Sequence, residues 1–320
     1  MNKDRFAVKV LIAGALLAGG GIASSQEFPA KPIRFITSAP GGGSDFAARL
    51  IAISMAPGIG QQVVVDNRGG GIIAPEVAVK APADGYSLLY YGSTLWLLPL
   101  MRDNVPWDTL KDFAPVILTV ITPTVLTVHP SLPVESVKDL IALARSRPGD
   151  LNYASGATGS ANHLSAELFK AMAKVNIVRI VYSGQGPAVL ALMSGEIQTS
   201  FAVAAAVQPH IRSGRLRALA VSSARPSELF PGVPTVAATL PGFEAVSPSG
   251  IFAPARTPEA IVNRLNQEIG RVLERPDVRQ KFAASGVEVV GGSPQEFVAK
   301  IKSEVSYMGK VIKDAGIRDQ

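Results

Sequence analysis

The chain has 320 residues, 47% of them hydrophobic and 18% charged, and a formal net charge of +6 at pH 7. This composition excludes an intrinsically disordered protein, and 30 glycines and 24 prolines without a short period exclude a collagen-like repeat. The lack of cysteine and the presence of only three histidines exclude disulfide scaffolds, iron–sulfur clusters and cysteine nucleophiles, and argue against a zinc or multi-histidine centre. We therefore expect no metal and no cofactor, and the length favours two domains.

Residues 1–25 have the layout of a cleavable secretory signal. Three basic residues precede an apolar run at 10–18, and small residues end the segment. The 14 residues at 10–23 are fewer than the ~18 that a spanning helix needs, although a retained N-terminal anchor is the alternative. We expect export to the periplasm, cleavage near Ser25 and Gln26, and a mature protein that is not inserted in the membrane.

The charges that remain after cleavage identify no partner. The signal holds three basic residues and one acid, so its removal lowers the net charge from +6 to +4. Lysine and arginine are dispersed among the acids, and no basic run is interleaved with aromatic residues. We therefore expect no nucleic acid as a partner.

Short β-branched runs alternate with amphipathic stretches after the signal. We expect strands at 33–37, 63–65 and 87–91, with helices at 45–55 and 73–81 between them. This β-α-β-α-β order predicts a parallel sheet with helices on both faces.

The same alternation begins again after residue 124. The expected strands are 126–128, 152–154, 177–181, 198–201 and 218–221, and the expected helices are 136–147, 162–173 and 187–193. Ser136 is placed to cap the first of these helices. The second block thus predicts a second α/β unit.

The C-terminal third is expected to be mostly helical. Thr257 is placed as an N-cap before Pro258, and Ser293 and Glu296 have capping-box spacing. Only one strand, at 287–290, is expected there, so this block cannot cover a sheet of its own and should pack on the first unit. We predict a first lobe of residues 26–122 plus 250–320 and a second lobe of 123–249, joined by crossings near 120–124 and 247–252.

The turn after the first strand has the strongest binding signal. It reads Pro40, Gly41, Gly42, Gly43, Ser44 and Asp45. Glycines let the backbone approach a ligand closely, and the start of the helix directs free N–H groups at it, which favours a carboxylate, phosphate or sulfate. The alternative is a tight turn without a ligand. The nucleotide-binding patterns G-x-x-x-x-G-K-[ST] and G-x-G-x-x-G do not occur there.

Two further polar turns follow expected strands. One contains Ser155, Gly156, Thr158, Gly159 and Ser160 and leads to His163; the other contains Ser93 and Thr94. Ligands in open α/β sheets bind beyond the carboxyl ends of the strands, so facing turns on two lobes predict a cleft. A serine nucleophile with His163 as base is disfavoured because no G-x-S-x-G elbow is present, and we expect that histidine to be a cap or a packed residue.

The turns match a known pattern. The matching stretches are 31–34, 40–45, 65–69, 80–86, 110–116, 151–156, 162–164, 214–220 and 231–235. In this order the chain closely resembles the Bug family, the extracytoplasmic substrate-binding proteins of tripartite tricarboxylate transporters. Each stretch is a weak signal alone, but together they are specific.

The resemblance implies an α/β, two-lobed type II periplasmic binding fold, each lobe a mostly parallel sheet flanked by helices, that closes on a small ligand, usually a carboxylate. It implies that the loops at 40–45 and 155–160 hold the carboxylate through backbone groups and bridging waters. Its implied partners are that ligand and the membrane components of the transporter, and we expect a monomer. Tyr182 and Ala202 complete the candidate ligand residues.

The chain departs from the family at two places. Ser183 follows Tyr182 where Tyr-Lys-Gly is common, and Ala202 and Val203 stand where an Asp and a small polar residue are common. If these positions face the cleft, the second lobe is less polar than usual, and we hypothesise a ligand with an apolar or aromatic distal part. The alternative is that they only pack.

Two other functions stay open from the sequence. One is an exported α/β hydrolase that uses Ser155, His163 and Asp45, for which no recognisable catalytic set is present. The other is an orphan receptor that feeds a signalling system. The resemblance favours a solute receptor that is not an enzyme.

Overall fold

The computed structural model describes residues 28–41, 43–69, 72–156 and 158–318. The predicted signal and its cleavage site lie outside these residues, as does Gly42. Among the helices of this described part, none combines the length and the apolar character required to cross a bilayer.

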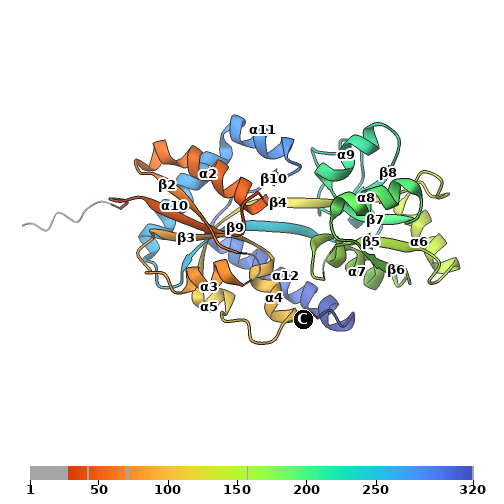
Figure 1. The fold of residues 1–320 in the computed structure, drawn as a ribbon, viewed down its shortest axis with the longest axis horizontal. Helices are drawn as coiled ribbons and strands as arrows, with labels where there is room; N and C mark the ends of the chain where they lie inside the picture. The colour runs from red at the N-terminus through yellow and green to blue at the C-terminus, as the bar shows by residue number, and fades with distance from the viewer. Residues whose placement is uncertain (1–27, 42, 70–71, 157, 319–320) are drawn as a thin grey trace, which may run out of the picture.

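Two α/β lobes share one continuous sheet path (Figure 1). Its strand order is β2-β1-β3-β9-β4-β7-β5-β6, while β8 and β10 also pair with β4. The long strand β4 (Phe113–Val128) pairs antiparallel with β9 (Val246–Pro254) over its first part and with β7 and β8 over its last part. These two strands run between the lobes in Figure 1, so the predicted two-lobed fold is confirmed.

The first lobe has the predicted parallel order. Strand β1 (Ile33–Thr37) lies between β2 (Val63–Asn67) and β3 (Ser87–Gly92), and both pairings are parallel because α2 (Gly43–Ile59) and α3 (Ile73–Val79) provide the crossovers. Apolar residues alternate between the faces of β1 and β3: one set packs with α2 and α10, the other with α3 and α4 (Thr94–Met101). The carboxyl end of β1 therefore opens at the start of α2.

The second lobe is built in the same way. Its strands are β5 (Asn152–Ser155), β6 (Val178–Val181), β7 (Thr199–Val203) and β8 (Arg217–Val221), and its helices are α6 (Val137–Ser146), α7 (Ala161–Ala173), α8 (Gln185–Ser194) and α9 (Ala204–Arg212). Strand β5 pairs in parallel with β6 and β7. Ser136 caps α6 as predicted, because its hydroxyl accepts a hydrogen bond from the Asp139 N–H at 3.1 Å.

The C-terminal segment returns to the first lobe. It consists of α10 (Glu259–Glu274), α11 (Pro276–Ala284), the short strand β10 (Glu288–Val289) and α12 (Pro294–Asp314). Helix α10 packs on α2 and α12 on α4, and α12 also contacts α7 of the second lobe. The capping box of Ser293 and Glu296 is present. The predicted cap of α10 is wrong by one residue, because Pro258 has an extended ψ of 136° and is itself the N-cap.

Several elements have no periodic sequence signal. Crossings between the lobes were expected near 120–124 and 247–252; the structure has strands β4 and β9 there, and they form a ladder in which Thr122 pairs with Ser247. Helix α4 is apolar on all sides and contains Pro99, so it shows no amphipathic pattern. The short helices α5 (Thr109–Asp112) and η1 (Val236–Ala238), like α9 with its internal Pro209, were also not predicted.

Candidate functional site

The conformation of the loop between β1 and α2 is stabilised by the contacts of Asp45. Gly41 has φ +81°, a left-handed conformation that glycine adopts without strain. The buried Asp45 carboxylate accepts a hydrogen bond from the Gly41 N–H at 3.0 Å and from Asn67 Nδ2 at 2.7 Å, and it pairs with Arg49 Nε at 2.9 Å. Burial alone would raise the pKa of Asp45, but these partners outweigh it and lower the pKa. Asp45 therefore supports the loop, and Gly41 already has an acceptor for its N–H.

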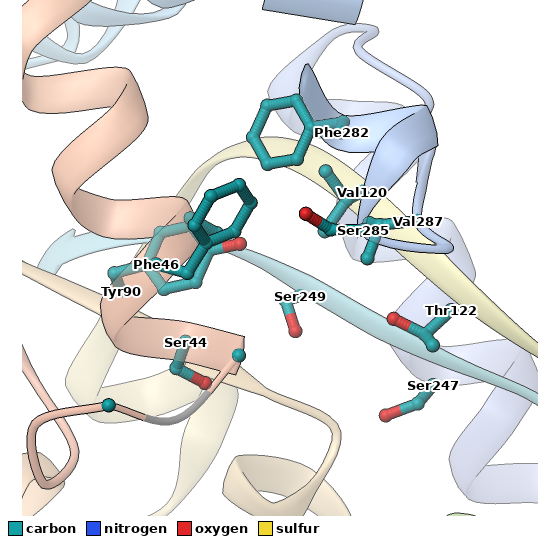
Figure 2. Close-up of a pocket in the computed structure, with 13 residues that line it drawn as sticks. Ser44, Phe46, Tyr90, Val120, Thr122, Ser247, Ser249, Phe282, Ser285 and Val287 are labelled. Atoms are coloured by element: carbon teal, nitrogen blue, oxygen red, sulfur yellow. The ribbon is translucent and has the colours of Figure 1, made fainter. Parts of the chain in front are cut away.

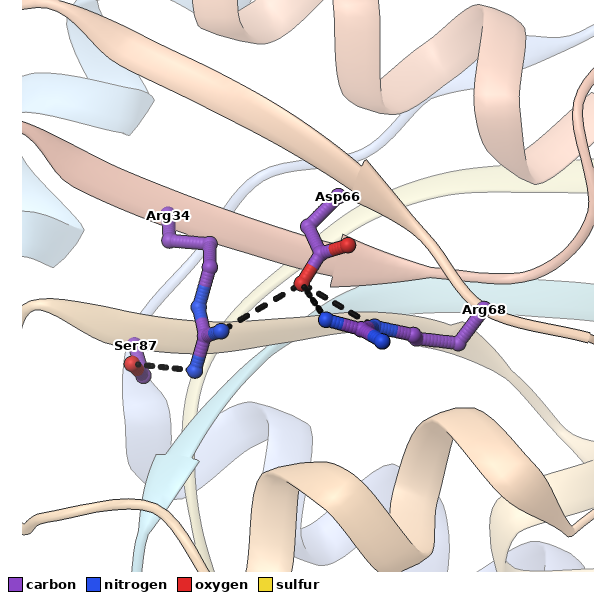
Figure 3. Close-up of polar contacts among 4 residues, drawn as sticks. All are labelled: Arg34, Asp66, Arg68 and Ser87. Carbon is purple, nitrogen blue, oxygen red and sulfur yellow. Dashed lines mark hydrogen bonds and ion pairs between the residues drawn. The ribbon is translucent and has the colours of Figure 1, made fainter.

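A matching stretch of the sequence, residues 65–69, supports the same loop. Asn67 Nδ2 donates to the Ser38 carbonyl at 2.8 Å as well as to Asp45. Its neighbour Asp66 accepts hydrogen bonds from Arg68 at 2.9 and 3.1 Å and from Arg34 at 3.3 Å, and Arg34 also reaches Ser87 at 3.1 Å (Figure 3). These contacts tie β1, β2 and β3 together beside the loop, so the stretch has a structural role.

A pocket of about 390 Å³ lies at the start of α2, and we call it the first-lobe pocket. Gly41 and Gly43 form part of its wall. Its hydroxyl half consists of Ser44, Thr122, Ser247 and Ser249, and its apolar half consists of Phe46, Ala47, Val120, Phe282 and Val287. Tyr90 and Ser285 lie with the apolar half, beside Phe46 and Val120 (Figure 2). Figure 2 shows the two halves on opposite sides of the space. None of the described residues that line this pocket has a charged side chain.

The crossing strands form the floor of this pocket. Thr122 of β4 pairs with Ser247 of β9, and Val120 pairs with Ser249, so the side chains of each pair are neighbours on one face. The walls come from α2 and from the end of α11 with the segment that follows it, which are far apart in the sequence. The first-lobe pocket is thus built where the chain passes between the lobes.

The loop between β5 and α7 is organised by an arginine. Arg179 of β6 donates from Nε to Ser155 Oγ at 2.7 Å, from one terminal nitrogen to the Gly156 carbonyl at 3.0 Å, and from the other to Thr158 Oγ1 at 3.5 Å. All three acceptors are neutral, so these hydrogen bonds do not offset the positive charge of the guanidinium beneath the loop. Arg179 was not predicted as a site residue, because an arginine in a short strand gives no sequence signal of the loop that it contacts.

The same loop is fixed by two residues at the start of α7. Asn162 Oδ1 accepts hydrogen bonds from Ser160 Oγ at 2.6 Å and from the Gly156 N–H at 3.3 Å. His163 Nδ1 accepts from the Gly159 N–H at 3.1 Å. Burial, followed by the Arg179 charge, lowers the pKa of His163 to about 4, so the imidazole is neutral at pH 7.

A second, small cavity of about 20 Å³ lies between the β5–α7 loop and the turn before α4. It is lined by Ser93 of the first lobe and Gly159 of the second, and by Ser247, which also lines the first-lobe pocket. Glu304 of α12 lies in its wall and is only 3% exposed. Its carboxylate accepts a hydrogen bond from Trp96 Nε1 at 3.2 Å.

Glu304 has a perturbed ionisation that the sequence analysis did not foresee. Burial raises the pKa of Glu304 to about 7, and the nearby charge of Lys300 and the Trp96 hydrogen bond do not compensate. The Lys300 ammonium donates its hydrogen bond to the Glu244 carboxylate, at 2.6 Å, and not to Glu304. Glu304 is therefore a proton-binding group at the contact between the lobes.

The remaining candidates lie away from the two cavities. Pro40 is an exposed turn residue, and Thr94 opens α4. The Tyr182 hydroxyl donates to Glu196 at 3.1 Å, and Ala202 is 1% exposed in the second-lobe core. Ala202 thus lines neither cavity, which favours the packing alternative at that departure from the family.

Comparison with known proteins gives consistent matches. The family model described as the tripartite tricarboxylate transporter family receptor matches residues 47–317. The protein BugT of Bordetella pertussis is 38% identical over 328 residues, covering 99% of each chain. An R. palustris structure with adipate is 36% identical with a TM-score of 0.74, covering 91% of this chain and 99% of that one. MatC from Rhodopseudomonas palustris with bound malate is 29% identical with a TM-score of 0.70, covering 89% and 100%.

Proposed function

Because the chain belongs to the tripartite tricarboxylate transporter receptor family, we propose that it captures a small carboxylate between its lobes and delivers it to the membrane components of such a transporter. The resemblance to the Bug family is confirmed. Solved relatives contain adipate and malate, which supports a carboxylate as the ligand class. The family consists of solute receptors, and we propose that this chain likewise binds its ligand without converting it.

The observation that carries this proposal is the first-lobe pocket at the start of α2. The first turn of a helix has N–H groups without intrahelical acceptors, and the helix dipole favours an anion there. Gly43 and Ser44 lie in that turn and line the pocket. We propose that their N–H groups hold one side of the carboxylate.

The second-lobe loop supplies the other side. Arg179 places a positive charge beneath Ser155, Gly156 and Thr158, and its hydrogen bonds to this loop go to neutral acceptors. A charge in a partly buried position is screened less than one at the surface, so it raises the affinity of the loop for an anion. In this arrangement the ligand carboxylate bridges the loops.

Ligand capture requires the lobes to move. We place the lobes at residues 26–122 plus 250–320 and 123–249, and we propose that they close about the crossing strands β4 and β9. The ligand shifts an open–closed equilibrium by its higher affinity for the closed form. The proposed setting is the periplasm, reached through the signal at residues 1–25, and the proposed state is a monomer.

The contacts of the hydrolase candidates favour a receptor. Ser155 Oγ accepts from Arg179 and donates to the Gly156 carbonyl, while His163 Nδ1 accepts from the Gly159 N–H of its own loop. Asp45 is engaged in the other lobe. These bonds hold loops, and they do not align a nucleophile with a base.

The test uses the processed protein, stripped of bound ligand by unfolding and refolding. Calorimetric titration with malate, adipate and monocarboxylates should give saturable heat for at least one acid, at a Kd near micromolar or about −8 kcal/mol. Mass spectrometry should recover that acid unchanged. A converted acid would identify an enzyme, and absence of binding by every acid would overturn the proposal. Binding without ligand uptake by cells that carry the transporter would favour the orphan receptor.

A further inference from the structure

The first-lobe pocket offers no cationic partner for a second carboxylate. Its described lining residues are uncharged, and the nearby Arg49 is already paired with Asp45 at 2.9 Å. A carboxylate that loses its water without a cation or a full set of hydrogen bonds is strongly disfavoured. The free N–H groups at the start of α2 can satisfy one carboxylate, the one that joins the loops.

The apolar half of this pocket contains an incompletely covered aromatic ring. Phe46 is 39% exposed, and its ring meets that of Phe282 edge-on, with centroids 6.0 Å apart and an interplanar angle of 87°. Val120 and Val287 lie on the same side of the space (Figure 2). An apolar ligand group that covers the exposed face of Phe46 removes that face and its own surface from water, which is favourable in proportion to the area buried.

The two halves therefore differ in the ligand groups that they suit. The hydroxyl half lies beside Ser44 in the first turn of α2, where the carboxylate is placed, and the apolar half lies beyond it on the other side of the space. A volume of about 390 Å³ is within the range of about 300–1,000 Å³ typical of small-molecule sites, so a chain of several carbons or a ring fits.

We propose that this receptor selects a monocarboxylate with an apolar tail, a ring or an alkyl chain, and that the exposed face of Phe46, which packs on the buried ring of Phe282, forms the subsite for the tail. This inference rests on the proposed function, because it assumes that the carboxylate binds at the two loops. It places selectivity for an apolar tail in the first lobe, whereas the sequence hypothesis placed it at Ser183, Ala202 and Val203 of the second.

The test is a calorimetric series with the stripped, processed protein, using acetate, butyrate, hexanoate and adipate. Each added methylene should tighten binding by about fourfold if the tail is fully buried. Hexanoate and adipate have the same chain length and differ in the distal group, methyl or carboxylate. Hexanoate should bind at least tenfold more tightly.

A variant and a matched control locate the subsite. Phe46→Ala should weaken hexanoate binding at least fivefold and leave acetate unchanged. Ile53→Ala removes a side chain from the same helix that is 74% exposed and does not line the pocket, so it should change neither affinity.

Each other outcome is decisive. Adipate binding as tightly as hexanoate, or no gain along the series, overturns the inference and leaves the proposed function standing. An equal loss with Phe46→Ala and Ile53→Ala overturns the assignment of the subsite. If none of the four acids binds, the inference is rejected; the proposed function is rejected as well only if malate also fails to bind.

Discussion

Replacing Glu304 with glutamine should alter how the stability of the protein depends on pH. Glu304 is 3% exposed, and its pKa rises from 4.5 to about 7 in the folded protein. Below pH 4.5 the carboxyl is protonated whether the chain is folded or unfolded. As the pH rises from there to about 7, the unfolded chain releases this proton while the folded chain keeps it, so the free energy of unfolding falls. Above about pH 7 the loss is complete.

The size of the loss follows from the shift. A difference of about 2.5 pKa units corresponds to about 3 kcal/mol, at about 1.4 kcal/mol per unit. Part of it is already lost at pH 5, so between pH 5 and pH 8 Glu304 should lower the free energy of unfolding by about 2–3 kcal/mol. Glutamine is neutral throughout and keeps an oxygen for the Trp96 N–H, so Glu304→Gln should lack this decline.

The assay is urea unfolding of both proteins at pH 5, 6, 7 and 8. The difference between variant and parent should grow by about 2–3 kcal/mol across the series in favour of the variant. Glu76→Gln is the control, since Glu76 is a surface residue paired with Lys80 at 2.8 Å and such pairs contribute about 0–1 kcal/mol. If the free energy of unfolding depended on pH in the same way for Glu304→Gln and for its parent, the argument from burial would be refuted.

Three further changes test how the loops and helices are held. Asp45→Ala leaves the Gly41 N–H without its acceptor, so it should lower the free energy of unfolding by about 1–3 kcal/mol in urea and weaken carboxylate binding; unchanged affinity would separate Asp45 from the site. Arg179→Met removes the positive charge beneath the Ser155 loop and should weaken binding of a carboxylate about tenfold, as measured by calorimetry. If the variant and its parent bind the carboxylate equally well, the ligand carboxylate does not bridge the two loops. Ser293→Ala deletes the capping box of α12 and should cost about 1 kcal/mol in urea unfolding without changing affinity.

Local patterns predict much of the fold. Strand β1 and helix α2 follow from β-branched and amphipathic periodicity, and the caps at Ser136 and Ser293 follow from spacing alone. Apart from the end of β4 at 126–128, the crossing strands were not predicted as strands, because β4 and β9 contain prolines and no clean alternation. Their partners are more than a hundred residues apart, and such pairing leaves no local signal.

The candidate site likewise contains residues that local sequence predicts and residues that only the fold brings into it. The loop at 40–45 and the loop at 155–160 have glycine and hydroxyl patterns that sequence alone identifies. Arg179, Phe282 and Glu304 contribute because the sheet register and the return of the C-terminal helices bring them there. Their surroundings come from distant parts of the chain, so only the folded structure reveals them.

The most direct test of the receptor is native mass spectrometry of the processed protein, purified from the periplasm of cells that express the full chain. We expect one carboxylic acid bound per monomer, released unchanged on unfolding, and rebound in competition with hexanoate. A protein that carries no acid and shows no saturable binding of any carboxylate would contradict it.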